Sequence, residues 1–176
     1  MRAAHGLFRL MRRKGDEAGA ARFALAAQRL YEPDAAGGPD LLLDLARYWT
    51  DHAEPSRAQA ALRRLGRRVP GLPPAGELAA LALTARACAQ RGHPLKGSAA
   101  RAPWPMLMDR EIAEEVRFAA ALDLAHAARL SGDLSAFTRA KREVLRLAPQ
   151  AAFPAVASAM ANMWPEGGTP SMELAS

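Results

Sequence analysis

Cysteine, aromatic residues and β-branched aliphatic residues are all scarce in this chain of 176 residues. Cys88 is the only cysteine, so no disulfide bond can form within the chain and nothing indicates an oxidising compartment. Aromatic residues make up 6% of the sequence, isoleucine occurs once and valine four times. Because β-branched and aromatic side chains are favoured in strands, their scarcity argues against a fold built on a β-sheet.

Long hydrophobic runs are also lacking. No stretch approaches the ~20 apolar residues that a bilayer-spanning helix requires. The first residues include apolar side chains, but Arg2, Arg9, Arg12 and Arg13 interrupt them, and no apolar core of signal-peptide length remains. We therefore expect no transmembrane segment, no leader peptide and a cytoplasmic location.

Lysine is rare in a chain that is nevertheless basic. Lys14, Lys96 and Lys141 are the only lysines among 24 basic residues, so arginine carries most of the positive charge behind the formal net charge of +6. A basic balance favours acidic partners such as nucleic acid, anionic lipid or acidic peptide segments. An alanine- and arginine-rich composition is also typical of a GC-rich genome, and composition leaves both interpretations open.

Alanine and leucine supply most of the apolar share, and both are good helix formers. Apolar residues recur at spacings of three and four, which gives each predicted helix one buried stripe. Leu41, Leu45 and Trp49, for example, share one helical face. The pattern predicts an all-α chain with helices over 2–14, 17–31, 39–52, 55–68, 75–91, 108–131, 134–147 and 150–163, the sixth of them starting at Asp109.

Four segments share one layout at a spacing of about 39 residues: a first helix, a short turn and a second helix. The clearest turns are Gly15-Asp16 and Gly132-Asp133. The third segment, around Gly92, lacks a credible second helix because prolines interrupt it at 94, 103 and 105. Two helices joined by a short turn cannot bury both apolar faces alone, so we expect the hairpins to stack.

This layout resembles the tetratricopeptide repeat, which has a first helix, a Gly-Asp-like turn, a second helix and a closing proline. The best match is Ala127-Ala128-Arg129-Leu130-Ser131-Gly132-Asp133-Leu134, with Leu145-Arg146-Leu147-Ala148-Pro149 after it. The resemblance covers most of residues 1–150. It implies tandem antiparallel helix hairpins in a short right-handed solenoid of about four repeats, with a degenerate third repeat. The expected boundaries are 1–164 for the repeat domain and 165–176 for a flexible tail.

The first helices of tetratricopeptide proteins line a concave side that binds extended peptides. When the four predicted first helices are superposed by their turns, one outward register reads Arg9, Arg47, Arg86 and His126, and Arg13 and Arg129 lie beside it. Guanidinium groups bind carboxylates through two parallel hydrogen bonds. The resemblance therefore predicts a basic groove for an acidic or amphipathic segment of a partner protein. Arginine is common enough in this chain for such a register to arise by chance, and that alternative stays open.

Two further features are candidate interfaces. Arg63, Arg64, Arg67 and Arg68 cluster at the end of a predicted second helix, where they fit either a nucleic-acid footprint or a favourable interaction with the helix dipole. Trp104 lies between two prolines in a predicted surface loop. It is either an exposed interface anchor or a side chain that folds back over the gap left by the missing second helix.

No motif for catalysis, a cofactor or a metal is present. The four histidines lie far apart, without ligand spacing to one another or to Cys88, and Cys88 itself is expected to be a buried, inert thiol. Neither a Gly-rich phosphate loop nor a nucleophile elbow is found. We therefore expect no enzyme and no cofactor, but an adaptor or chaperone-like interaction module, by analogy of fold with short tetratricopeptide-like secretion chaperones.

Two alternatives remain from the sequence. One is a nucleic-acid-associated regulatory domain that acts through the arginine cluster at 63–68. The other is a structural subunit of a larger bacterial assembly, whose exposed apolar ends would make the isolated chain form oligomers. The residues expected at these ends are Leu7, Phe8 and Met11 on one side and Phe153, Met160 and Trp164 on the other.

Overall fold

A computed structural model describes residues 2–31, 38–66 and 71–163, and all regular secondary structure within these ranges is helical. The helices are α1 (Arg2–Lys14), α2 (Glu17–Arg29), α3 (Gly38–Asp51), α4 (Pro55–Leu65), α5 (Pro74–Gln90), α6 (Gly97–Arg101), α7 (Pro103–Leu107), α8 (Glu114–Leu130), α9 (Leu134–Leu147) and α10 (Phe153–Met163), with a 3-10 turn over Gln150–Ala152. The all-α prediction is confirmed. Within the same ranges, no helix has both the length and the apolar character needed to cross a membrane.

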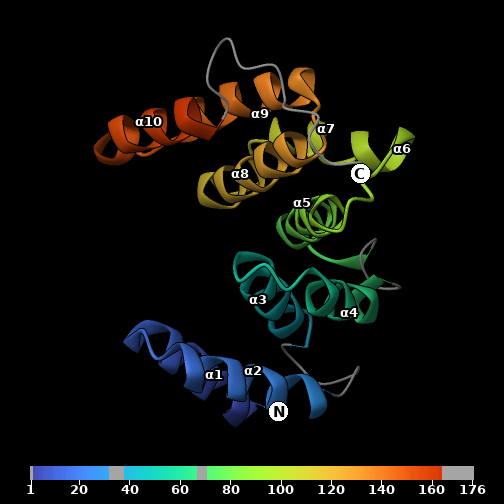
Figure 1. The fold of residues 1–176 in the computed structure, drawn as a ribbon, viewed down its shortest axis with the longest axis vertical. Coiled ribbons are helices and arrows are strands. Elements are labelled where there is room, and N and C mark those ends of the chain that lie inside the picture. The colour runs from blue at the N-terminus through green and yellow to red at the C-terminus, as the bar shows by residue number, and fades with distance from the viewer. Residues whose placement is uncertain (1, 32–37, 67–70, 164–176) are drawn as a thin grey trace, which may run out of the picture.

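The helices pack as pairs that succeed one another along the long axis of the molecule (Figure 1). α1 packs on α2, α3 on α4 and α8 on α9, while α5 contacts α3 and α4 on one side and α8 on the other. Figure 1 shows α1 and α2 at one end and α10 at the other. Tandem packing of helix pairs, which the apolar stripes predicted, is therefore present.

α5 is the element that joins two hydrophobic cores. Ala80, Leu83 and Ala87 belong to the core formed with α1 to α4, whereas Leu78 and Ala82 belong to the core formed with α7 to α10. A helix that is buried on both sides needs apolar residues around most of its circumference, and the sequence of α5, rich in alanine and leucine, provides them.

Four turns of the same geometry end the four first helices. Gly15, Ala53, Gly92 and Gly132 each have a positive φ, of 70°, 54°, 73° and 68°. In each turn, the next residue donates its backbone N–H to the carbonyl five residues earlier, at 2.8 to 3.0 Å. This is the hydrogen bond of a Schellman cap. The repeat spacing of about 39 residues predicted from sequence is thus matched by a repeated backbone conformation.

The residue after each turn decides whether a full second helix begins there. Asp16 accepts the N–H of Gly19 at 2.8 Å and Asp133 accepts that of Ala136 at 2.9 Å, so both aspartates cap a full second helix. In the third unit His93-Pro94 comes directly after the turn, and only the short helices α6 and α7 form before α8. The predicted lack of a complete second helix in this unit is confirmed.

Trp104 lies in α7 and not in an exposed loop. Its side chain is 8% exposed and belongs to the core between α5 and α9, where the guanidinium carbon of Arg139 lies 4.5 Å from the centroid of its rings. The indole therefore fills the space left by the absent helix, as the fold-back interpretation predicted. The interpretation of Trp104 as an exposed interface anchor is wrong.

Other boundaries differ from the sequence prediction for local reasons. α8 begins at Glu114, because the Asp109 side chain accepts the backbone N–H of Glu111 in a separate turn and Ile112 is buried before the helix starts.

The predicted apolar ends of the stack are present only in part. Phe8 and Met160 are buried, so they do not contribute to apolar ends, whereas Leu7 and Phe153 are exposed. Trp164 and the predicted tail, 165–176, lie outside the described residues.

Candidate functional site

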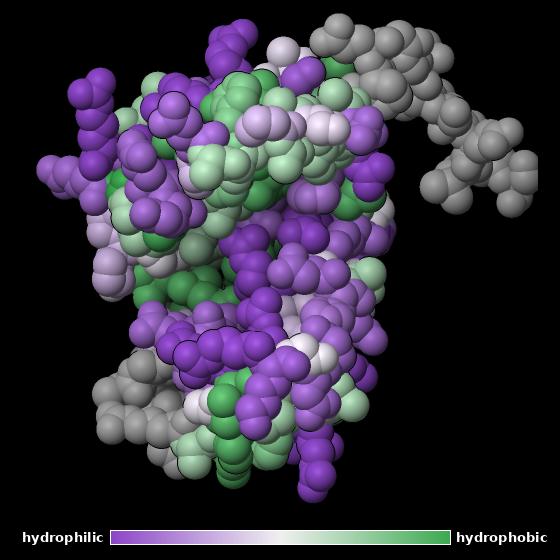
Figure 2. Space-filling model, turned by 90° about the vertical axis from the view of Figure 1, so that its left-hand side faces the viewer, coloured by the Kyte–Doolittle hydropathy of each residue, from purple (hydrophilic) through white to green (hydrophobic). Residues whose placement is uncertain are grey.

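The first helices of the units, α1, α3, α5 and α8, carry the predicted register of Arg9, Arg47, Arg86 and His126, and we call the side formed by these residues the inner surface. α4 and α6 lie on the opposite side of the stack (Figure 1). Figure 2 looks from the side away from α4 and α6. It shows a hollow at mid-height with hydrophobic side chains at its floor, and hydrophilic side chains beside and below it.

The middle of the inner surface is tied together by a buried carboxylate. Asp123 of α8 is 0% exposed. Arg47 of α3 places Nη1 at 2.7 Å from Oδ1 and 2.6 Å from Oδ2 of Asp123. Arg86 of α5 donates from Nη1 to Oδ1 of Asp123 and to Oδ1 of Asp51, each at 2.9 Å. This network of Arg47, Asp51, Arg86 and Asp123, the inner ion network, joins three consecutive units.

The buried carboxylate of Asp123 is under two opposing influences, burial and the positive charge of its partners. Burial raises the pKa of Asp123, and the positive charges of Arg47 and Arg86 act in the opposite direction. A buried carboxylate is costly unless it has charged or hydrogen-bonding partners, and here two guanidinium groups supply them. Nη1 of Arg47 and Nη1 of Arg86 are therefore paired with carboxylates of the chain, whereas the buried Nε of Arg86 has no hydrogen-bond partner among the described residues.

His126 is on the same surface but does not add a positive charge. Its partial burial, together with the nearby positive charges of Arg86 and Arg129 as smaller causes, lowers its pKa to about 4. The imidazole is thus neutral near pH 7. His126 lies on the inner surface as predicted, but the prediction that it adds to the positive charge of the register is wrong, because the imidazole is neutral near pH 7.

The α1 end of the inner surface is different, because it keeps unpaired positive charge. A hollow of about 490 Å³ is lined by Arg9, Arg12, Arg13 and Asp44. Arg9 donates from Nε to Oδ2 of Asp44 at 2.6 Å, and the imidazole of His5 lies 2.8 Å from the same oxygen. We call the four lining residues the basic hollow.

Arg12 and Arg13 have no carboxylate partner among the described residues. The guanidinium carbon of Arg12 lies 5.9 Å from the ring centroid of Phe8 and 5.7 Å from that of Tyr48. Such cation–π contacts orient the group without neutralising it. Arg13 is exposed. The two groups can therefore bind an external anion without first breaking an ion pair.

The carboxylates of the inner surface were missed by the sequence analysis, although a signal for them exists. Asp44 and Asp51 lie three residues before and four residues after Arg47, and Asp123 lies three residues before His126. These spacings put each aspartate on the same helical face as the basic register. A search for both signs of charge in that register would have found them.

The other sequence-predicted interface residues lie elsewhere. Arg63 and Arg64 are exposed at the end of α4, and Nη1 of Arg64 donates to the backbone carbonyl of Gln28 at the end of α2. Arg67 and Arg68 lie outside the described residues. Cys88 is half-buried, not fully buried as expected, and the side-chain amide of Gln59 lies 3.3 Å from its sulfur.

In the part of the chain that the structure describes, no three histidine, cysteine or acidic residues form a cluster able to hold a metal ion. Of the inner surface, the basic hollow at the α1 end is the part suited to holding anions by charge and hydrogen bonds. Comparison of the chain with protein-family models, with curated proteins and with solved structures finds no match.

Proposed function

We propose that this chain is a tetratricopeptide-like interaction module, an adaptor or chaperone, that holds an acidic or amphipathic segment of a partner protein on its inner surface. The observation that carries this proposal is the basic hollow, in which three arginines face one carboxylate. The role assigned here to Arg47 and Arg86 is to hold the units together, while Arg9, Arg12 and Arg13 meet the partner.

The repeat architecture supports the proposal. Four first helices end in Schellman-type turns at nearly constant spacing, at Gly15, Ala53, Gly92 and Gly132. Three of these turns lead into full second helices. Stacked helix pairs of this kind present their first helices along one extended surface. Such a surface can contact a partner segment over several units.

The charge of the hollow favours a carboxylate-rich partner. Arg9 and Asp44 are paired, which leaves Arg12 and Arg13 as net positive charge. Arginine binds carboxylates in a planar, two-pronged geometry. The hydrophobic side chains at the floor of the mid-height hollow in Figure 2 would add contact for an amphipathic segment that extends along the stack.

A charge-reversal experiment tests this function. The probe is a fluorescent amphipathic peptide of about 20 residues with glutamates on one helical face, and the readout is anisotropy. Arg12→Glu with Arg13→Glu should weaken binding about tenfold or more. The matched control, Arg22→Glu with Arg63→Glu, changes the net charge equally on exposed sites of α2 and α4 and should leave most of the affinity.

Circular dichroism of both double variants checks that the helices remain. Equal loss of affinity in the two variants would show that the peptide responds only to net charge. Unchanged affinity in the Arg12 and Arg13 variant would remove the basic hollow from the proposal.

A second candidate function is that of a structural subunit. Leu7 and Leu10 on α1 are 39% and 38% exposed, and Phe153 on α10, at the other end of the stack, is 45% exposed. Exposed apolar side chains at both ends of a repeat stack favour end-to-end contacts. Sedimentation equilibrium decides this: association that Leu7→Ser and Phe153→Ser abolish supports it, and a monomer at high concentration contradicts it.

A further inference from the structure

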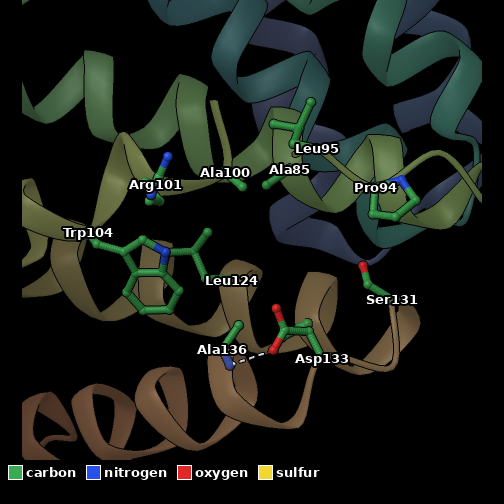
Figure 3. Close-up of a pocket in the computed structure, with 11 residues that line it drawn as sticks. Ala85, Pro94, Leu95, Ala100, Arg101, Trp104, Leu124, Ser131, Asp133 and Ala136 are labelled. Carbon is green, nitrogen blue, oxygen red and sulfur yellow. Dashed lines mark hydrogen bonds between the residues drawn. The ribbon is translucent and has the colours of Figure 1, made fainter. Parts of the chain in front are cut away.

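A pocket of about 320 Å³ lies between α5, α7, α8 and the start of α9, where the third unit has no full second helix (Figure 3). Four alanines line it and leave room inside: Ala85, Ala100, Ala128 and Ala136. In Figure 3, the rings of Trp104 stand beside Leu124, and Leu95 lies across the pocket from Asp133. This volume is at the lower end of the range of small-molecule sites.

The pocket is separate from the inner surface. Leu124 and Ala128 are four residues apart on α8 and share one face, whereas Asp123 lies one residue earlier and bonds to Arg47 and Arg86. Adjacent residues of a helix point about 100° apart. A ligand in the pocket would therefore contact neither the inner ion network nor the basic hollow.

Two of the three polar lining residues are already engaged within the chain. Ser131 donates its hydroxyl to the carbonyl of Ala127 at 2.7 Å, and Asp133 caps α9 by accepting the N–H of Ala136 at 2.9 Å. The positive end of the α9 dipole partly offsets the charge of Asp133.

The third polar residue, Arg101, is exposed and has no ion pair with a described residue. A second guanidinium, that of Arg139, lies 4.5 Å from the centroid of the Trp104 rings. Arg139 is not one of the lining residues, so the pocket combines an apolar interior with one cationic side chain, Arg101, and one carboxylate, Asp133, which caps α9.

We infer that this pocket binds a ligand with a short apolar chain that ends in one carboxylate. The apolar part would lie among Trp104, Leu95 and Leu124, and the carboxylate would bind the guanidinium of Arg101. A free carboxylic acid and the carboxyl-terminal residue of a peptide share this chemistry.

The experiment monitors the indole N–H resonance of Trp104 in the ¹⁵N-labelled full chain during titration. One arm compares hexanoate with hexan-1-ol and hexylamine. A second arm compares the peptide acetyl-Gly-Gly-Leu, with a free carboxylate, with its carboxyl-terminal amide. Each acid that enters the pocket should bind about fivefold more tightly than its uncharged counterpart, which is the size expected for an exposed ion pair. The arm with the tighter acid identifies the source of the ligand.

Two kinds of variant make the result specific. Arg101→Gln should remove the preference for the acid, whereas Arg110→Gln, at an exposed arginine outside the pocket, should keep it. Ala136→Leu fills the pocket and should abolish saturable binding, and Ala100→Leu on α6 is an independent filling variant if Ala136→Leu disturbs α9. The inference is overturned if neither acid binds more tightly than its uncharged counterpart, or if a folded filling variant still binds with unchanged affinity.

Discussion

Among single residues, Asp123 has the largest consequence for how the inner surface works. Its carboxylate is buried and contacts guanidinium groups from two other helices, so Arg47 and Arg86 are held by the chain itself. Breaking a buried ion pair by removing one partner leaves the other charges uncompensated, which is far more costly than losing a surface pair. The residue is therefore expected to matter for stability more than for binding.

Replacing Asp123 tests that assignment. Asp123→Ala should lower the free energy of unfolding by about 3–5 kcal/mol, because two arginines lose their buried partner. The measurement is urea unfolding monitored by circular dichroism. The control is Glu111→Ala, which removes an exposed carboxylate that forms no ion pair with a described residue. It should change the free energy of unfolding by less than about 0.5 kcal/mol. A cost for Asp123→Ala as small as that of the control would contradict the role of the network.

His126 predicts a pH dependence. Its folded-state pKa of about 4 lies below the ordinary value of 6.5, so the unfolded chain binds the proton more readily. The stability due to the neutral imidazole is fully present above pH 6.5 and is lost as the pH falls from 6.5 to about 4. Because the side chain is partly exposed, we expect the loss to be roughly 1–2 kcal/mol.

The measurement compares urea unfolding of the native chain and of His126→Gln between pH 7 and pH 4.5. Other groups titrate in both proteins, so the difference between the two curves isolates His126. The native chain should lose more stability on acidification than the variant. Parallel curves would contradict the lowered pKa.

At the scale of secondary-structure elements, the sequence predicted what is local. Helix periodicity and the turns are set by residues within about one turn of one another, and the predicted helices begin and end close to the observed ones from α1 to α5. The start of α8 was predicted five residues too early, because Asp109 looks like a helix cap but closes a separate turn with Glu111. Whether Asp109 caps a helix or closes a turn depends on the burial of Ile112. That burial is a tertiary contact, which the local sequence does not specify.

Among the four turns, that of the second unit is the one without a glycine at the position of positive φ. Ala53 adopts a φ of 54°, which costs a non-glycine residue about 1 kcal/mol or more, and Glu54 makes no capping hydrogen bond to α4. Ala53→Gly with Glu54→Asp would give this turn the Gly-Asp sequence of the first and fourth units. We expect the free energy of unfolding to rise by about 1–2 kcal/mol.

The reciprocal change provides the control for this prediction. Gly132→Ala places a Cβ at a φ of 68° in the fourth unit and should lower stability by about 1 kcal/mol. Thermal unfolding of both variants gives the comparison. A destabilised Ala53→Gly, Glu54→Asp variant would show that the four turns are not equivalent.

At the scale of the whole molecule, long-range pairing is what the sequence could not supply. Arg47 and Asp123 are 76 residues apart, and their contact depends on how α3, α5 and α8 stack. The spacing of Asp44 and Asp51 around Arg47 indicated a shared face, but not which helix each would reach. The burial of Trp104 could be stated only as one of two alternatives, because the missing helix left its neighbours undefined.

The inner surface is divided into the inner ion network, which stabilises the stack, and the basic hollow, which meets the partner. This division predicts different effects for two pairs of arginines. Arg47→Glu with Arg86→Glu places new carboxylates beside Asp51 and Asp123, and should destabilise the contacts of α3, α5 and α8 together. Arg12→Glu with Arg13→Glu breaks no ion pair, although it removes the cation–π contacts of Arg12 and places negative charge at the C-terminal end of α1, so it should lower the unfolding midpoint in urea much less than the first double variant. Equal midpoints for the two double variants would contradict the division.

The arginine Nε–Hε resonances of the native chain report both roles at once. During titration with the glutamate-rich peptide, those of Arg12 and Arg13 should shift to saturation, while those of Arg47 and Arg86 should stay in place and exchange slowly with solvent. Shifts at Arg47 and Arg86 instead, or equal small shifts at all arginines, would contradict our proposal that the basic hollow at α1 holds an acidic segment while the inner ion network holds the helices.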